Sequence, residues 1–220
     1  MLLAVDTSTT QVGLALYDGA HVIGEFAWRS SQRHTTELAP AVSDLLTRCG
    51  STMDDVDALG VALGPGSFTS LRVGLALVKG LALSKQIPLI GIPTFDIHAH
   101  AQTVSELPLA VAIQAGRSRF AMGWYKSSGK AWQAQGGGRI VTLEEIIAEV
   151  ESPSIVCGEF SAEERQKLNN ENIRLASPVL SIRRPAILAE LAWARWQAGD
   201  VDDAASLAPI YLQTDGSLPV

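Results

Sequence analysis

The sequence has few cysteines, no excess of positive charge and no long hydrophobic run. Its 220 residues include two cysteines, Cys49 and Cys157, and their spacing matches no metal-binding motif. Isolated cysteines within apolar patterns are typical of free, buried thiols in a reducing compartment. The net charge is −6 at pH 7, so the chain lacks the basic face that nucleic-acid-binding domains use. If a nucleic acid is involved, we expect that this chain does not hold it alone.

Signals for secretion and membrane insertion are also missing. Residues 1–6 (MLLAVD) carry no basic segment and reach Asp6 too early for a signal peptide. No uninterrupted apolar run approaches the roughly 18 residues that a membrane span needs. With 47% hydrophobic and 18% charged residues, the composition is that of a well-packed globular protein. We therefore expect a cytoplasmic protein that makes no contact with a membrane.

Histidine pairs with metal-ligand spacing do not occur. His98 and His100 stand two positions apart on an expected helix, where their side chains point about 200° apart and cannot chelate one ion. No H-E-x-x-H or H-x-x-x-H motif is present. His34 lies beside Thr35 near the start of an expected helix, which favours a capping or interface role. The sequence therefore predicts no metal site.

The centre of the sequence is a glycine-bracketed turn between a strand and a helix. Apolar residues 57–63 predict a buried strand, which the Gly-Pro-Gly turn at 64–66 ends. Ser67 is a suitable N-cap for a helix that continues to about Ser84. Such a turn gathers backbone N–H groups that suit an anion, although no Walker-type lysine follows it.

The helix at 67–84 is apolar on most sides. At helical spacing, a stripe that could face water consists of Arg72, Ala76, Lys79 and Leu83. Gly74 and Gly80 each cost roughly 1 kcal/mol relative to alanine in an exposed helix, so we expect another group to approach closely at both. A helix of this kind is buried inside its own domain, against a second subunit, or both.

The N-terminal strand ends at an acid and a hydroxyl-rich turn. Residues 2–5 predict a strand that reaches Asp6, and the turn at 7–10 (TSTT) precedes two further strands at 11–17 and 22–28. This turn could receive a phosphate and its metal, and an ordinary hairpin turn is an equally consistent interpretation. The candidate nucleotide-binding residues are Asp6, Ser8, Thr9, Gly64 and Gly66.

The element order predicts an α/β protein with two βββαβα-type halves, the second one reduced. The first half, residues 1–103, continues with helices at 36–49 and 94–102 and a strand at 88–92. The second half, residues 104–220, is expected to contain strands at 109–114, 119–126, 130–135 and 154–157, helices at 143–150, 161–168 and 185–198, and an extended end at 209–212. Element order alone carries this duplication, because no residue-level repeat is visible.

A phosphotransferase of this duplicated design would need a second acid after the first strand of the second half. That position falls at 114–116 (QAG), which holds no carboxylate. We therefore predict no catalytic residues and the scaffold of a nucleotide-binding fold with weak or lost catalytic power. The alternative, an ATP-dependent small-molecule kinase, would depend on Asp6 for nucleotide and magnesium binding.

The glycine turn and the helix after it resemble the signature of a known protein family. The run at 64–82 (GPGSFTSLRVGLALVKGLA) resembles the GPGSFTGLR signature and following helix of the bacterial TsaB (YeaZ) family, with Ser70 where the family usually has glycine. Residues 3–9 (LAVDTST) are similar to the first strand and turn of that family. His34, Thr35, Leu38 and Pro40 resemble the loop-to-helix segment of the family. The end of the chain resembles a PxYLR motif at Pro209, Tyr211 and Leu212, with Gln213 in place of the arginine. Gln114 stands where the family usually has an acid.

The resemblance implies a duplicated actin-like (ASKHA, RNase H-like) fold. It also implies a non-catalytic partner subunit of the complex that forms N6-threonylcarbamoyladenosine at position 37 of tRNA. In that system TsaD is the catalytic, metal-binding subunit and the ATPase TsaE joins the pair. The expected partners are therefore a TsaD homologue and TsaE, a second copy of this chain when it is alone, and tRNA only through the complex.

The resemblance further implies no cofactor of its own, with ATP or ADP at the partner interface left open. A glycoprotease activity of the kind once attached to relatives would require a metal and is disfavoured. The residues expected at the partner interface are His34, Glu37, Ser70, Val73, Gly74, Leu77, Val78, Gly80 and Leu81. The alternative, that both helices only fill the core of this chain, stays open on periodicity alone.

Overall fold

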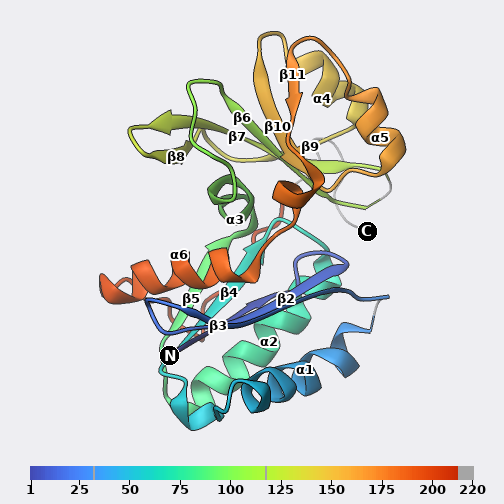
Figure 1. Cartoon of the computed structure of the whole chain (residues 1–220). Coiled ribbons are helices and arrows are strands. Elements are labelled where there is room, and N and C mark those ends of the chain that lie inside the picture. The colour runs from blue at the N-terminus through green and yellow to red at the C-terminus, as the bar shows by residue number, and fades with distance from the viewer. Residues whose placement is uncertain (32, 117, 213–220) are drawn as a thin grey trace. The chain divides into compact units, whose positions relative to one another are not determined.

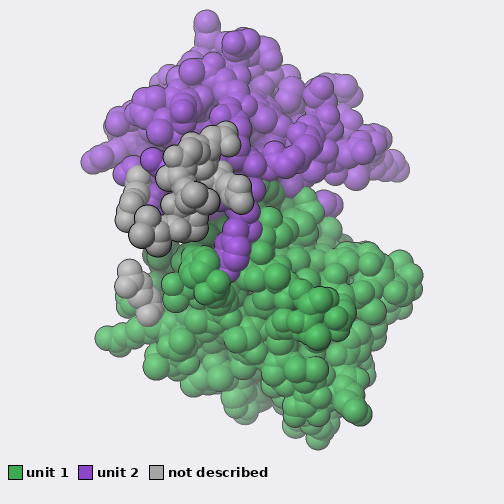
Figure 2. Space-filling model, turned by 180° about the vertical axis from the view of Figure 1, so that it is seen from behind, with its two compact units in different colours: residues 1–97, 183–210 green, residues 98–182, 211–220 purple. Residues whose placement is uncertain are grey.

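The computed structural model describes residues 1–31, 33–116 and 118–212, so Gln213 lies outside the described residues. The chain forms two compact units (Figure 2), unit 1 with residues 1–97 and 183–210, and unit 2 with residues 98–182 and 211–220. These units differ from the halves expected at 1–103 and 104–220, because the chain returns to unit 1 at residue 183. Element order could not assign this last helix to a sheet.

Unit 1 contains a five-stranded sheet with the order β3-β2-β1-β4-β5. The strands are β1 (Leu2–Asp6), β2 (Gln11–Tyr17), β3 (Val22–Arg29), β4 (Ala58–Gly64) and β5 (Leu89–Pro93). β1, β2 and β3 form an antiparallel meander, whereas β4 runs parallel to β1 and to β5. Because adjacent parallel strands end at the same edge of a sheet, Asp6 and Gly64 lie at one edge.

Helices cover both faces of this sheet. Figure 1 shows α1 (His34–Arg48) and α2 (Phe68–Lys85) on one face and α6 (Pro185–Gln197) on the other. The core under α1 and α2 is built of large aliphatic residues such as Leu14, Leu45 and Val78. The core under α6 is richer in alanine, and a Cβ on Gly60 would lie 2.8 Å from the Cβ of Ala192. The small residues therefore let α6 lie close to the sheet.

Unit 2 contains a six-stranded sheet with the order β11-β10-β6-β7-β8, in which β9 pairs with β7. Its strands are β6 (Leu109–Gln114), β7 (Phe120–Ser128), β8 (Ala131–Ala134), β9 (Arg139–Val141), β10 (Ser154–Gly158) and β11 (Ile173–Leu175). Its helices are α4 (Leu143–Glu149) and α5 (Ala162–Lys167), while α3 (Thr94–His100) bridges the division of the chain at residue 97. The sequence patterns missed β9 and β11, because three residues are too few to show a period.

The expected starts of α2, α3, α4 and α6 are confirmed to within one residue, whereas α1 begins at His34, two residues before the expected start at 36. The Thr142 hydroxyl accepts a hydrogen bond from the Glu145 backbone N–H at 3.2 Å, and the Glu145 carboxylate accepts one from the Thr142 N–H at 2.7 Å. This is the predicted capping box. Ser67 does precede α2, but its hydroxyl accepts a hydrogen bond from the Ser70 hydroxyl and caps no backbone N–H. In the described part of the chain, no helix is both long enough and apolar enough to cross a membrane.

Candidate functional site

The β1–β2 turn and the glycine turn meet directly at the edge where β1 and β4 end. The Ser67 backbone N–H donates to the Ser8 carbonyl oxygen at 2.7 Å. A Cβ on Gly66 would overlap that oxygen and would lie 3.0 Å from the Ser8 carbonyl carbon. Glycine is therefore required at position 66, because the two backbones touch. The structure does bring the candidate nucleotide-binding residues together, but it packs them against each other.

Hydroxyl groups complete this contact. The Ser8 and Thr94 hydroxyl groups share a hydrogen bond of 2.8 Å, and the Gly64 N–H donates to the Thr94 hydroxyl at 2.9 Å. Gly64 has φ 104°, a conformation that glycine adopts without strain. Thr94 opens α3, so the first residue of that helix links the two turns.

A buried arginine from the segment before α6 lies against Asp6. The Nε of Arg183 donates to Asp6 Oδ2 at 2.7 Å, and an Nη donates to the Thr9 hydroxyl at 2.9 Å and to the Gln11 carbonyl oxygen at 3.1 Å. Asp6 is 2% exposed and Arg183 is 1% exposed. The sequence analysis missed Arg183, because its partner lies 177 residues away and the arginine stands in no recognisable motif.

Both carboxylate oxygens of Asp6 have partners within the chain. Oδ2 accepts from Arg183, and Oδ1 accepts from the Ser8 backbone N–H at 2.8 Å. A magnesium ion bound to Asp6 would lie beside the buried guanidinium of Arg183, which already supplies the positive charge at this carboxylate. The residues at this edge therefore do not fit a nucleotide–magnesium complex. They form a closed, hydrogen-bonded junction of β1, β2 and the start of α6.

A second feature of unit 1 is an open groove between α1 and α2. Its volume is about 470 Å³, and it is lined by His34, Thr35, Leu38, Ala39, Phe68, Thr69, Arg72, Val73, Ala76 and Leu77. Phe68 is 53% exposed, and the guanidinium carbon of Arg72 lies 3.6 Å from the centre of its ring. An exposed aromatic ring with a stacked cation is typical of interface residues, where Phe and Arg are enriched.

Four of the residues expected at a partner interface instead face the core of unit 1. Ser70, Gly74 and Val78 are buried on the side of α2 that packs on the sheet. His34 borders the groove but is 6% exposed, and its Nε2 lies 3.0 Å from the Thr9 carbonyl oxygen. The reason is that the apolar pattern of a helix shows that a residue is buried but does not show which body buries it.

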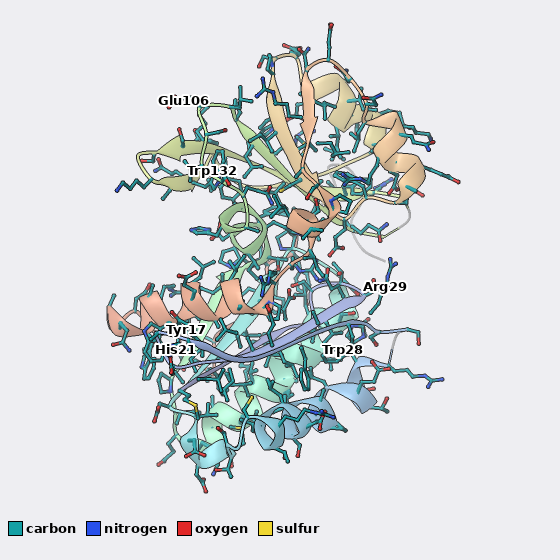
Figure 3. All side chains as sticks on the ribbon, viewed as in Figure 1. Tyr17, His21, Trp28, Arg29, Glu106 and Trp132 are labelled. Atoms are coloured by element: carbon teal, nitrogen blue, oxygen red, sulfur yellow. The ribbon has the colours of Figure 1, made fainter. Side chains whose placement is uncertain are left out.

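The remaining expected interface residues stay accessible to different degrees. Val73 and Leu77 are half-buried and line the groove, Leu81 is half-buried, and Gly80 is exposed, with no atom within 4 Å of the place that a Cβ would take. Glu37 accepts a hydrogen bond at 3.1 Å from the indole N–H of Trp28, a β3 residue labelled in Figure 3. This bond lowers the pKa of the Glu37 carboxyl, so the charged carboxylate anchors α1 to the sheet.

The C-terminal segment contacts α2 at Lys79. The ammonium group of Lys79 donates to the carbonyl oxygens of Ala205 at 3.2 Å and Leu207 at 2.9 Å. The Ile210 N–H donates to the Leu63 carbonyl oxygen at 2.7 Å. Lys79 is therefore half-buried, although the sequence placed it on a stripe facing water.

The sequence is similar to proteins of tRNA modification. A family model described as TsaD, tRNA N6-adenosine threonylcarbamoyltransferase, matches residues 27–181. The tRNA threonylcarbamoyladenosine biosynthesis protein TsaB of Escherichia coli is 39% identical over 93 residues, which are 42% of this chain and 40% of that protein. The protein of the same name from Haemophilus influenzae is 40% identical over 116 residues, 52% of this chain and 47% of that protein. The chain thus spans less than half the length of these curated relatives.

The fold is similar to that of solved structures over nearly the whole chain. YeaZ from Pseudomonas aeruginosa is 25% identical, with a TM-score of 0.75, and the match covers 96% of this chain and 99% of that one. A second structure, described as a protein with similarity to peptidase YeaZ from the same organism, has a TM-score of 0.78 at 25% identity and the same coverage. These matches confirm both the resemblance found at residues 64–82 and the predicted two-sheet, actin-like α/β fold.

Proposed function

We propose that this chain, which belongs to the TsaD family of tRNA N6-adenosine threonylcarbamoyltransferases, is a partner subunit without catalytic residues of its own. Its role is to support a catalytic TsaD homologue in forming N6-threonylcarbamoyladenosine on tRNA. The name of the TsaB relatives supports the pathway. The observation that carries the partner role is the apolar groove between α1 and α2, which the described residues leave open.

The groove suits an apolar surface of another protein better than a small polar substrate. Five of its ten lining residues are aliphatic, and the exposed Phe68 ring at its side would be buried by a partner. Arg72 adds a cation that a carboxylate of the partner can pair with. In our proposal the TsaD homologue occupies the groove, a second copy of the chain occupies it when TsaD is absent, and TsaE joins the assembled pair.

The rest of the molecule supports a non-catalytic role. Asp6 is held by Arg183, which removes the support for the kinase alternative. Within the described residues, no three His, Cys, Asp or Glu side chains gather as metal ligands, so nothing favours the glycoprotease alternative. With a net charge of −6, the chain is suited to reach tRNA only through the complex. The proposal includes a cytoplasmic location, no cofactor of its own, and ATP or ADP at the partner interface as an open question.

The test is a matched pair of charge substitutions on α2. Val73→Glu places a carboxylate in the groove, whereas Leu83→Glu places one on the same helix at a position that is 66% exposed and does not line the groove. Burial of an unpaired carboxylate costs several kcal/mol and each 1.4 kcal/mol is a factor of ten, so we expect Val73→Glu to weaken pairing with the TsaD homologue at least about tenfold. Leu83→Glu should pair like the unchanged chain.

Affinity is measured with the purified TsaD homologue by calorimetry or size-exclusion chromatography. Circular dichroism of each variant establishes that the fold is kept, because Val73 is only half-buried. Normal pairing of a folded Val73→Glu variant would refute the groove as the docking surface. Equal losses in both variants would also count against it, because the effect would then follow the added charge and not its place.

A further inference from the structure

The buried guanidinium of Arg183 does more than neutralise the charge of Asp6. We propose that the Arg183 guanidinium is a built-in substitute for an external cation at Asp6. It fills the place that a metal-bound phosphate would need at the β1–β2 turn. In doing so it closes this edge to nucleotide–magnesium complexes and fastens the start of α6 to the sheet.

The Arg183 guanidinium donates hydrogen bonds to three different kinds of oxygen. Its donors go to a carboxylate, a hydroxyl and a backbone carbonyl, on Asp6, Thr9 and Gln11 respectively. A carboxylate, a hydroxyl and a carbonyl are also the oxygen ligands that a hard divalent cation would take. The arginine side chain therefore satisfies an oxygen-lined site from within, and the side chain itself is fully buried.

The backbone on both sides of Arg183 is anchored to the sheet. The Arg183 carbonyl oxygen accepts a hydrogen bond from the Gln11 side chain at 3.3 Å. Two residues later, Pro185 opens α6 and packs on β2, where a Cβ on Gly13 would lie 3.0 Å from its ring. The backbone on both sides of the guanidinium is thus held against the sheet. Binding of an external cation at Asp6 would require separation of a buried ion pair.

The next residue in the chain, Arg184, has a different environment. Arg184 is exposed and pairs with Glu25 on β3. Exposed ion pairs contribute little to stability, whereas removal of one partner of a buried pair leaves an uncompensated charge. The two adjacent arginines therefore differ in burial and in their partners, and Arg184→Ala is the control for loss of an exposed, ion-paired arginine.

The experiment is chemical rescue of the full chain. We expect Arg183→Ala to lower Tm by roughly 6–20 °C, and Arg184→Ala to lower it by no more than about 4 °C. Guanidinium chloride at tens of millimolar, compared with sodium chloride at equal ionic strength, should raise the Tm of Arg183→Ala by several degrees. It should not raise the Tm of the unchanged chain or of Arg184→Ala. A lack of selective rescue in a folded Arg183→Ala variant would overturn the proposal.

Two further measurements keep the proposal testable if Arg183→Ala does not fold. The double variant Asp6→Asn with Arg183→Met removes both charges, and we expect it to fold and to melt at a higher temperature than Asp6→Asn alone. The opposite order of Tm would contradict the pairing argument. Calorimetry of the unchanged chain with millimolar ATP and magnesium should show no binding, and binding that disappears in Asp6→Asn would overturn the proposal. No readout involves the TsaD homologue, so docking in the groove is tested separately, whereas ATP binding that depends on Asp6 would restore support for the kinase alternative.

Discussion

Substitution of alanine for each of the two glycines of α2 should change the free energy of unfolding in opposite directions. Gly74 faces Thr7, the residue after β1, where an added Cβ would overlap the Thr7 hydroxyl oxygen and would lie 3.1 Å from its Cγ2 and 3.2 Å from its Cβ. Rotation of Thr7 could move the hydroxyl, but its Cβ is fixed by the backbone. Gly80 is exposed, and an added Cβ would have no atom within 4 Å.

The expected free energies follow from these contacts. Alanine gains about 1 kcal/mol over glycine in an exposed helix, so Gly80→Ala should raise the free energy of unfolding by up to about that amount. Gly74→Ala gains the same term but adds overpacking of about 1–3 kcal/mol. It would also disrupt the buried hydrogen bond of 2.7 Å from the Thr7 hydroxyl to the Ser70 carbonyl oxygen. Leaving one of these groups unpaired costs about 1–3 kcal/mol. These terms together give a net loss of about 1–5 kcal/mol.

Urea denaturation followed by circular dichroism measures both variants. The midpoint should rise for Gly80→Ala and fall by on the order of 1 M for Gly74→Ala, given a slope of about 2 kcal/mol per molar urea. In a Thr7→Ala background, Gly74→Ala should cost less by at least about 1 kcal/mol, because the overlapping atoms are gone. If Gly74→Ala stabilises the chain as Gly80→Ala does, the packing of α2 on β1 described above is wrong.

Three other predictions concern separate parts of the molecule. Burial raises the pKa of the Cys157 thiol, so a thiol reagent at neutral pH should label the half-buried Cys49 in the native protein and Cys157 only in denaturant. The hydrogen bond from Trp28 lowers the pKa of Glu37 in the folded chain. The stabilising contribution of Glu37 is therefore present above the ordinary glutamate pKa and is lost as pH falls through the folded value. In Glu37→Gln, thermal melts should show a weaker dependence of Tm on pH in that acid range. Thr142→Ala removes a capping box and should lower the free energy of unfolding by about 1 kcal/mol in urea titrations.

The local patterns of the sequence were sufficient for most of the elements. The strands at 11–17 and 109–114 have the predicted bounds, and α2 begins one residue after the predicted N-cap, Ser67. These elements are set by alternation, helical period and turn residues, which act between neighbours in the chain. β9 and β11 were missed because they are held by pairing with distant strands and are too short to carry a period.

The candidate nucleotide site shows where local patterns stop being informative. The acid, the hydroxyl-rich turn and the glycine turn were recognised, and the structure does place them at one edge of the sheet. Whether that edge is open depends on Arg183, whose side chain arrives from the far end of the chain. The requirement for glycine at position 74 likewise rests on Thr7, a contact across 67 positions that a helical period does not encode.

Most of the elements, their order, the family signature at 64–82 and the apolar character of α2 can be read from the residues alone. The packing of unit 1 was needed to show which side of α2 lies on the sheet and which side, against α1, stays open. The same packing returns α6 to unit 1 and brings a cation to Asp6. This division arises because residue patterns record whether a side chain prefers to be buried, while its neighbour in the core is chosen by the packing of the whole unit.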